Sequence, residues 1–190
     1  MVNRLSRIIT RTGDKGATGL ANGERASKNS PRIHVIGEID ELNSVLGLLR
    51  AEHLPETLRR MLLTIQNDLF DLGGEISLPG AKLIKKRQVE FLEEQAATLN
   101  ANLPMLKEFI LPGGGRAASL AHLARSVCRR AERALVALAE SENGQERACQ
   151  PESLRYLNRL SDFLFILARA LNLEVGEKDV FWQKPMPDKP

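Results

Sequence analysis

Aromatic residues are scarce in this sequence, at 4% of its 190 residues, with a single Trp and a single Tyr. Leu and Ala make up much of the apolar set instead. β-Strands are enriched in aromatic and β-branched residues, whereas Ala and Leu favour helices. The composition therefore disfavours a sheet-based core and predicts a mainly helical fold. The length and the hydrophobic share of 43% are typical of one globular domain with a single core.

Cysteines and long apolar runs are also few. The two cysteines, Cys128 and Cys149, do not form a C-x-x-C pair, which favours reduced thiols in a cytoplasmic protein. No apolar run approaches the roughly 20 residues that a helix needs to span a bilayer. The first ten residues, MVNRLSRIIT, are too polar for a secretory signal. These features predict a cytoplasmic protein without a membrane partner.

The sequence has little excess of either sign of charge, since 27 basic and 24 acidic residues give a net charge of +3. A duplex-binding protein usually carries a concentrated basic surface, so nucleic acid is not an expected partner. The three histidines are scattered and no Glu-x-x-His pair exists, which argues against a di-iron bundle. No Ser-His-Asp combination stands out either, so a covalent or general-base mechanism has little support.

Apolar residues recur at steps of three and four in five segments, which predicts five amphipathic helices. The first ends near Arg50 and the second begins near Pro55, with a connection over residues 73–86. The third covers about 87–100, the fourth about 117–140, and the fifth carries leucines from Leu157 to Leu171. Helices of this length with short connections predict an all-α, up-and-down, ferritin-like five-helix bundle. We expect one domain over 1–190, divided into a nucleotide-binding loop segment (8–32), the helical bundle (33–173) and a tail (174–190).

The segment from Thr10 to Gly19 has an unusual spacing of glycines. Gly13, Gly16 and Gly19 recur every three residues, with hydroxyl and cationic side chains between them. Glycines let successive backbone N–H groups converge on an anion, and Lys28 would add a positive charge. The segment matches neither the Walker pattern nor G-x-G-x-x-G. By itself it is compatible with a phosphate-binding loop or with a plain cluster of turns.

Several polar residues lie close to the expected apolar faces. On the fourth helix a basic stripe follows helical spacing, beside Glu132 and next to an apolar face of Leu120, Leu123, Val127 and Ala131. The stripe consists of His122, Arg125, Arg129 and Arg133. It is either a solvated helix face or a ligand-binding face.

Two further helices carry polar residues of this kind. On the fifth helix, Asn158 and Asp162 are expected near the leucine seam, where unpaired polar groups are costly. They are either a buried hydrogen-bonded pair or part of a site. On the first helix, Asp40 is positioned to pair with an arginine of the fourth, within one chain or across a subunit boundary.

Five strings in a fixed order carry a family resemblance. They are TRTGDKGATGL from Thr10, GEIDELNSVLGLLRA from Gly37, FILPGGG from Phe109, CRRAER from Cys128 and LNRLSDFLFILAR from Leu157. Over about residues 8–170 the chain resembles the PduO-type ATP:cob(I)alamin adenosyltransferases. Five separate motifs in register make chance similarity an inadequate explanation.

The resemblance implies a fold, an assembly and a reaction. Members of this family are five-helix bundles that form homotrimers with active sites between subunits. They transfer the 5′-deoxyadenosyl group of ATP to the cobalt of cob(I)alamin, giving adenosylcobalamin and tripolyphosphate, with Mg²⁺ accompanying the nucleotide. A cob(II)alamin reductase and a cobalamin-dependent mutase or dehydratase are the partners this implies. An alternative role is that of a carrier delivering adenosylcobalamin to such an enzyme.

The resemblance also assigns roles to individual residues. Phe109 matches the aromatic residue that excludes the lower axial base of cobalamin, and Asp40 matches the acidic residue that pairs with Arg129 across the trimer interface. Arg133 is expected to clamp phosphate, since a guanidinium bonds two oxygens at once. These four residues are the expected catalytic set. The expected nucleotide-binding residues are Thr10, Arg11, Thr12, Gly13, Asp14, Lys15, Thr18, Gly19, Lys28, Arg129, Arg130, Glu132, Arg133 and Asn158. No protein ligand for Mg²⁺ is assigned, since the ion is expected mainly on the ATP phosphates.

Three departures from the family pattern are visible. Ala17, followed by Thr18, stands where relatives often carry Thr or Ser after the second loop glycine. The connection around Ser141 to Gln150 is longer than in some relatives. The tail after Leu173 matches no family motif. These differences affect expected tail contacts with the corrinoid and leave the ATP site unchanged.

Overall fold

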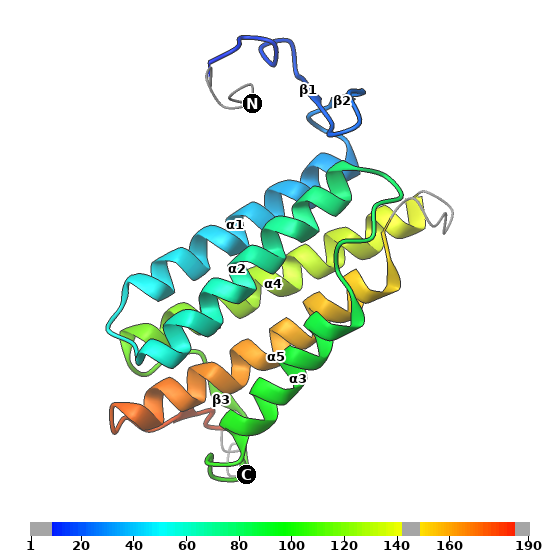
Figure 1. Cartoon of the computed structure of the whole chain (residues 1–190). Helices are drawn as coiled ribbons and strands as arrows, with labels where there is room; N and C mark the ends of the chain where they lie inside the picture. Colours follow the sequence, from blue (N-terminus) through cyan, green and yellow to red (C-terminus); the bar gives the residue numbers. More distant parts are fainter. Residues whose placement is uncertain (1–8, 142–148, 185–190) are drawn as a thin grey trace, which may run out of the picture.

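A computed structural model describes residues 9–141 and 149–184, and within them the chain forms five helices and two small antiparallel strand pairs (Figure 1). The helices are α1 (Pro31–Ala51), α2 (Glu56–Ser77), α3 (Lys86–Asn100), α4 (Arg116–Ser141) and α5 (Pro151–Glu174). The strands are β1 (Ala17–Gly19) paired with β2 (Arg25–Ser27), and β3 (Ile110–Leu111) paired with β4 (Val180–Phe181). The predicted all-α five-helix bundle is confirmed. None of the described helices is long and apolar enough to cross a membrane.

Local sequence explains where the helices begin and end. Pro31 and Pro151 occupy the first turns of α1 and α5, where their fixed φ suits the helix and no N–H is needed. The expected connection from Gly73 was placed too early, because α2 continues to Ser77. A glycine inside a helix lowers the stability of the helix by about 1 kcal/mol relative to alanine. Full burial of Ile76 stabilises the fold by more than this, so the helix continues past Gly73.

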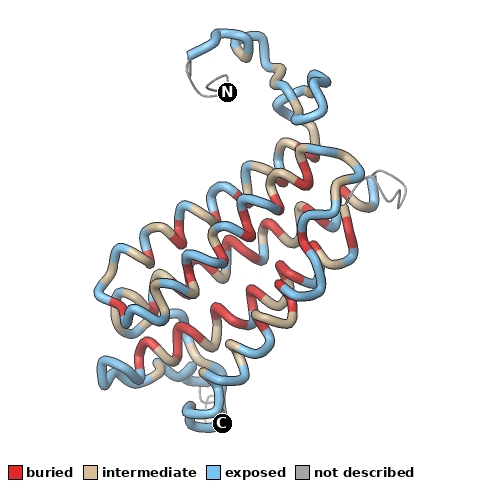
Figure 2. The backbone as a smooth tube through the Cα atoms, viewed as in Figure 1, coloured by how far each residue is buried: buried red, intermediate tan, exposed pale blue. Residues whose placement is uncertain are grey.

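The predicted leucine seams form the core. All five seam leucines of α5 and the α2 residues from Leu62 to Ile76 at the predicted spacing are buried, as Figure 2 shows along the inner faces of the helices. α1 packs against α2 and α4, and α5 packs against α4 and α3. α4 is therefore flanked by two helices, and its position determines which of its faces remains open for a ligand.

The apolar face predicted for α4 was partly wrong, because not all of its residues are buried. Leu123 is 48% exposed, whereas His122, expected in the basic stripe, is only 3% exposed. α4 turns small residues such as Ala121, Ala124 and Ala131 inward, which allows α1 and α5 to approach closely. A pattern built on large residues misses such a face. On α5, Asp162 is exposed and does not lie in the seam, so the buried pair with Asn158, one of the two alternatives, does not form.

Hydrogen bonds of buried side chains fix the position of α2 relative to α5 and to the connection that leads to α3. The Glu75 carboxylate accepts hydrogen bonds from the backbone N–H groups of Leu83 and Ile84 and from the Ser153 hydroxyl. The Tyr156 hydroxyl donates to Asp68, whose pKa is raised by burial. Buried polar groups with partners specify one arrangement of helices at little net cost.

The strand pairs lie at opposite ends of the bundle. The β1–β2 hairpin extends beyond the end where α1 begins, whereas β3 lies beside the ends of α3 and α5 (Figure 1). The N-terminal segment expected as a loop thus contains a hairpin, and part of the tail forms β4. The longer connection expected after Ser141 falls largely on residues 142–148, outside the described residues.

Candidate active site

The glycine-spaced loop is ordered around a tight turn. The Gly16 N–H donates to the Gly13 carbonyl over 3.2 Å, and Gly16 has φ of +79°, a conformation that favours glycine. Arg11 has φ of +59°, which is uncommon for a residue with a side chain. The Thr10 and Thr12 hydroxyls lie 2.9 Å apart. Residues held in such conformations are frequent in ligand-binding loops.

Two cations hold or flank this loop. The Arg25 guanidinium donates to the carbonyls of Thr12 (2.7 Å) and Ala17 (2.8 Å), tying the loop to the hairpin. The Lys28 ammonium lies so close to Gly13 that a Cβ there would sit 3.1 Å from Nζ. The structure thus brings Lys28 to the loop, as the sequence predicted. Arg25 was missed, although its pairing opposite Gly19 is the kind of contact that a hairpin pattern predicts.

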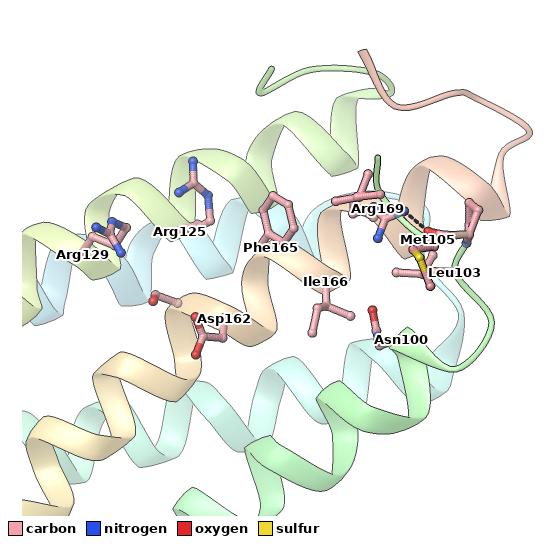
Figure 3. Close-up of a pocket in the computed structure, with 12 residues that line it drawn as sticks. Asn100, Leu103, Met105, Arg125, Arg129, Asp162, Phe165, Ile166 and Arg169 are labelled. Atoms are coloured by element: carbon pink, nitrogen blue, oxygen red, sulfur yellow. Dashed lines mark hydrogen bonds between the residues drawn. The ribbon is translucent and has the colours of Figure 1, made fainter. Parts of the chain in front are cut away.

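A second set of site residues surrounds a cavity of about 640 Å³ formed by α4, α5 and the segment after α3 (Figure 3). Arg125 and Arg129 of α4 line it together with Asp162 and Phe165 of α5, and all four are labelled in Figure 3. Leu103, Met105 and Ile166 supply an apolar wall. One part of the cavity is therefore cationic and another is mainly apolar, with Asn100 and Arg169 beside the apolar residues.

The cationic side carries unbalanced charge. Within the part of the chain that the structure describes, Arg125, Arg129 and Arg133 form no ion pair with a carboxylate of the same chain. Burial and the neighbouring Arg129 lower the pKa of Arg125, and its Nε is buried without a hydrogen-bond partner. An unpaired buried guanidinium donor is costly. A bound polyanion would supply the missing acceptors and offset the repulsion between the arginines.

Arg130, which was expected at the nucleotide, is engaged elsewhere in this chain. Its guanidinium binds the carboxylates of Glu38 and Glu41 on α1. The adjacent position on a helix points about 100° away, so Arg130 faces α1 while Arg129 faces the cavity. Arg133 follows Arg129 by one turn and is exposed, so it extends the cationic side toward the end where α4 terminates.

Asn158 and Glu132, two further expected nucleotide contacts, belong to one hydrogen-bonded network. Asn158 Nδ2 donates to Glu132 (3.1 Å), and its Oδ1 accepts from Arg159 (2.6 Å), which also binds Glu93 of α3. The network links α4, α5 and α3 at partly buried positions. It fixes the orientation of the Asn158 amide beside the arginines.

Phe109 lies at the same end of the bundle as the 640 Å³ cavity, in the segment that leads into β3. Its side chain is 79% exposed and lines a neighbouring cavity of about 410 Å³ together with Leu106 and Phe165. Phe165 borders both cavities, so the two adjoin. An exposed aromatic beside an apolar hollow marks a ligand contact surface.

His122 supports Phe165 from beneath. The two rings meet edge to face with centroids 6.1 Å apart. Burial, then the positive charge of Arg125, lowers the pKa of His122, so its imidazole is neutral in the core. His122 thus packs under the cavity wall and does not form part of a solvated basic stripe.

Asp40 does not meet Arg129 within one chain, since the described residues contain no ion pair of Asp40 with an arginine. It lines a third cavity, of about 370 Å³, between α1 and α2. The exposed Phe70 of α2 borders the same cavity. The pairing within the chain, one of the two alternatives, is therefore absent, and the pairing between subunits stays a prediction.

The described polar and apolar groups define a class of protein: a helical bundle with an arginine-lined cavity beside an apolar hollow. Comparison with known proteins gives the family. The family model described as cobalamin adenosyltransferase matches residues 8–171. The chain belongs to the cobalamin adenosyltransferase family.

Individual relatives agree with this assignment. A cobalamin adenosyltransferase of Cupriavidus metallidurans is 58% identical, over 97% of this chain and 98% of its own. A corrinoid adenosyltransferase of Bacillus subtilis is 45% identical, over 94% and 93%. A variant PduO-type ATP:corrinoid adenosyltransferase from Lactobacillus reuteri, solved with cobalamin and ATP, is 34% identical with a TM-score of 0.85, over 94% of this chain and all of its own.

Several cavity residues escaped the sequence analysis. Met105 lines the 640 Å³ cavity and lies in none of the quoted motifs. Arg169, the last residue of the string from Leu157, also lines it but was not counted among the binding residues. Arg125 was seen in the basic stripe but was not counted among the binding residues. Asp162 was placed beside Asn158 on the fifth helix, and Phe165, three residues after Asp162, shares its face, which was the available signal.

Proposed function

We propose that this chain transfers the 5′-deoxyadenosyl group of ATP to the cobalt of cob(I)alamin, forming adenosylcobalamin and tripolyphosphate. The observation that carries the proposal is the 640 Å³ cavity of a chain of this family, in which the unpaired Arg125 and Arg129 face an apolar wall. The arginines suit a triphosphate. The apolar wall and the neighbouring Phe109 suit the large face of a corrinoid.

The chemistry requires little from protein acids or bases. The electron pair of cobalt(I) forms the bond to C5′ of the ribose, and the C5′–O bond breaks with its electrons going to the departing triphosphate. No proton needs to be removed from the nucleophile. The protein must align C5′ with cobalt and stabilise the negative charge that grows on the leaving group. Unpaired guanidinium groups held in a partly buried cavity fit this task.

We assign Arg129 and Arg133 to the triphosphate, with Asn158 and Glu132 as further nucleotide contacts. The loop residues Thr10 to Gly19 and Lys28 would bind the same nucleotide through backbone N–H groups, hydroxyls and the ammonium. Arg130 binds Glu38 and Glu41 of α1 and does not reach the nucleotide. It would contribute to the site by holding α4 in position. Phe109 would cover the lower face of cobalt and exclude water and the axial base.

The glycine loop and the cavity beside Phe109 lie too far apart in one chain to bind the same ATP. We therefore propose that the chain forms a homotrimer with the site between subunits. The β1–β2 hairpin extends from one end of the bundle and Phe109 lies at the other, with a helix of 21 residues (about 30 Å) between them (Figure 1). A loop from a neighbouring subunit would complete the cavity. Asp40 and the exposed Phe70 provide a polar and an apolar contact for the subunit interface, with Arg129 of the neighbour as the partner of Asp40.

Mg²⁺ is proposed to enter with the nucleotide. Among the described residues no group of three or more His, Cys, Asp or Glu side chains is arranged to hold a metal ion. Mg²⁺ takes oxygen ligands and usually binds through substrate phosphates and water. The residues present therefore fit an ion that is held by the triphosphate and neutralises part of its charge.

Anaerobic activity measurement tests the proposal. Incubation of the protein with ATP, Mg²⁺ and chemically reduced cobalamin is expected to yield light-sensitive adenosylcobalamin and tripolyphosphate. Omission of ATP or of the reductant serves as the control. A folded protein that forms no product under strictly anaerobic conditions would refute the activity.

A second candidate function is delivery of adenosylcobalamin to a cobalamin-dependent mutase or dehydratase, with a cob(II)alamin reductase as the upstream partner. The exposed Phe109 surface favours it, since a product bound at an open cavity is accessible to an acceptor protein. Transfer of labelled cofactor to such an enzyme, faster than release into solution, would support delivery. Cys128 and Cys149 form no disulfide in the part of the chain that the structure describes, which suits the cytoplasm as the proposed location.

A further inference from the structure

The tail that follows α5 is bound to the segment that carries Phe109. β4 pairs with β3 so that Ile110 lies opposite Phe181 and Leu111 opposite Val180. The Trp182 N–H adds a hydrogen bond of 2.8 Å to the carbonyl of Phe109 itself. The backbone at Phe109 is therefore fixed by the tail, while the phenyl ring remains free to meet a ligand.

A buried ion pair fastens the tail to the bundle. Arg169 of α5 is only 5% exposed, and its Nε donates to Asp179 Oδ2 over 2.8 Å. The same guanidinium donates through Nη2 to the Pro104 carbonyl over 2.7 Å. One side chain thus holds both the start of the Phe109 segment and the tail that pairs with the middle of the segment. Removing one partner of a buried ion pair leaves an uncompensated charge.

The far end of the Phe109 segment is held independently. The Asn172 side chain accepts from the Gly115 N–H (3.0 Å) and donates to the Gly113 carbonyl (3.2 Å). The segment from Pro104 to Gly115 is consequently anchored at both ends. Its middle, where Phe109 lies, is hydrogen-bonded to the tail through β4 and the Trp182 N–H. Asp179 fastens the tail to the bundle, and the tail in turn binds the backbone at Phe109. The Asp179 carboxylate therefore affects the position of Phe109 more directly than the two ends of the segment.

We propose that Asp179 is a positioning residue, which acts through Arg169 and β4 to set where Phe109 meets the corrinoid. This inference rests on the proposed function and extends it to a residue outside every family motif quoted above. Asp179 lines neither the 640 Å³ cavity nor the 410 Å³ cavity. Its substitution is expected to affect the corrinoid side of the reaction and to leave ATP binding unchanged, because Arg129 and the loop do not depend on the tail.

The test compares Asp179→Asn with Glu177→Gln, which removes the same charge from an exposed tail position. Trp182 is the single Trp of the chain, so its fluorescence reports tail docking without any ligand. In Asp179→Asn we expect stronger acrylamide quenching of Trp182 and faster amide exchange at Phe109 to Leu111. We expect kcat/KM for cob(I)alamin to fall on the order of 100-fold, as for a reacting group misplaced by about 1 Å, with KM for ATP unchanged.

The possible outcomes separate the two proposals. Unchanged quenching and exchange would refute the tail anchor, and changed quenching with unaltered corrinoid kinetics would refute the positioning role. Equal effects of Glu177→Gln would also overturn it. A wild-type chain without turnover would refute the proposed function and the catalytic role, while quenching still decides the anchor. If Asp179→Asn loses helical circular dichroism, Arg169→Lys takes its place, because an ammonium cannot span both acceptors as the guanidinium does. Arg169 also lines the 640 Å³ cavity, so this variant is judged by quenching, amide exchange and corrinoid kinetics and not by KM for ATP.

Discussion

Gly114 offers a quantitative test of how the Phe109 segment is anchored. Its φ is +96°, and a Cβ at this position would lie 2.2 Å from Oδ1 of Asn172, which is 2% exposed. Gly114→Ala must therefore adopt a left-handed conformation, at about 1–2 kcal/mol. It must also displace the Asn172 amide and break its two hydrogen bonds, at about 0.5–1.5 kcal/mol each. The expected loss in free energy of unfolding is about 2–5 kcal/mol.

Gly80→Ala is the matched control. Gly80 has a similar φ of +87°, but no heavy atom lies within 4 Å of its Cβ position. It is expected to lose only the conformational part, about 1–2 kcal/mol. Urea unfolding followed by circular dichroism measures both variants. Equal losses for the two would refute the reasoning, and so would an undiminished loss for Gly114→Ala in an Asn172→Ala background, where the obstructing amide is absent.

Three further predictions concern the site and the core. Arg133→Ala is expected to lower turnover by 10²–10³-fold, or about 2.7–4 kcal/mol of transition-state stabilisation, while circular dichroism is preserved. Asp40→Asn is expected to weaken trimer assembly, measured by sedimentation, because an ion pair between subunits loses one charge. The pKa of His122 is lowered in the folded state, so the unfolded chain binds its proton first. Stability should therefore fall as the pH drops below about 6.5, by at most about 1.4 kcal/mol per unit, and His122→Gln should lack that component.

Clear results would contradict each of these. Near wild-type turnover of Arg133→Ala would remove Arg133 from the site, and Arg133→Lys is the control that keeps the charge. A trimer of Asp40→Asn with full activity would contradict the pairing with Arg129, for which Asp71→Asn, an exposed carboxylate of α2, is the control. Equal pH dependence of the wild type and His122→Gln would show that His122 titrates normally.

The sequence alone predicted the bundle because its signal is local. Leucine spacing on α2 and α5 reports which face is apolar, and Pro55 marks where a helix begins. Proximity of Lys28 to the glycine loop was also predictable, since only a short hairpin separates them. The face of α4 was not, because inward alanines bury little area and give a weak periodic signal.

Only the tertiary structure decided how the site is assembled and supported. Arg129 and Arg130 are adjacent and equally basic, yet one faces an open cavity and the other binds α1, which depends on how α4 is rotated between its neighbours. The pairing of β4 with β3 and the bond from Arg169 to Asp179 join segments that share no periodicity. The sequence by itself determined the helices, the loop and the family. Packing determined which charges remain unpaired, because pairing depends on distances between elements that local patterns do not encode.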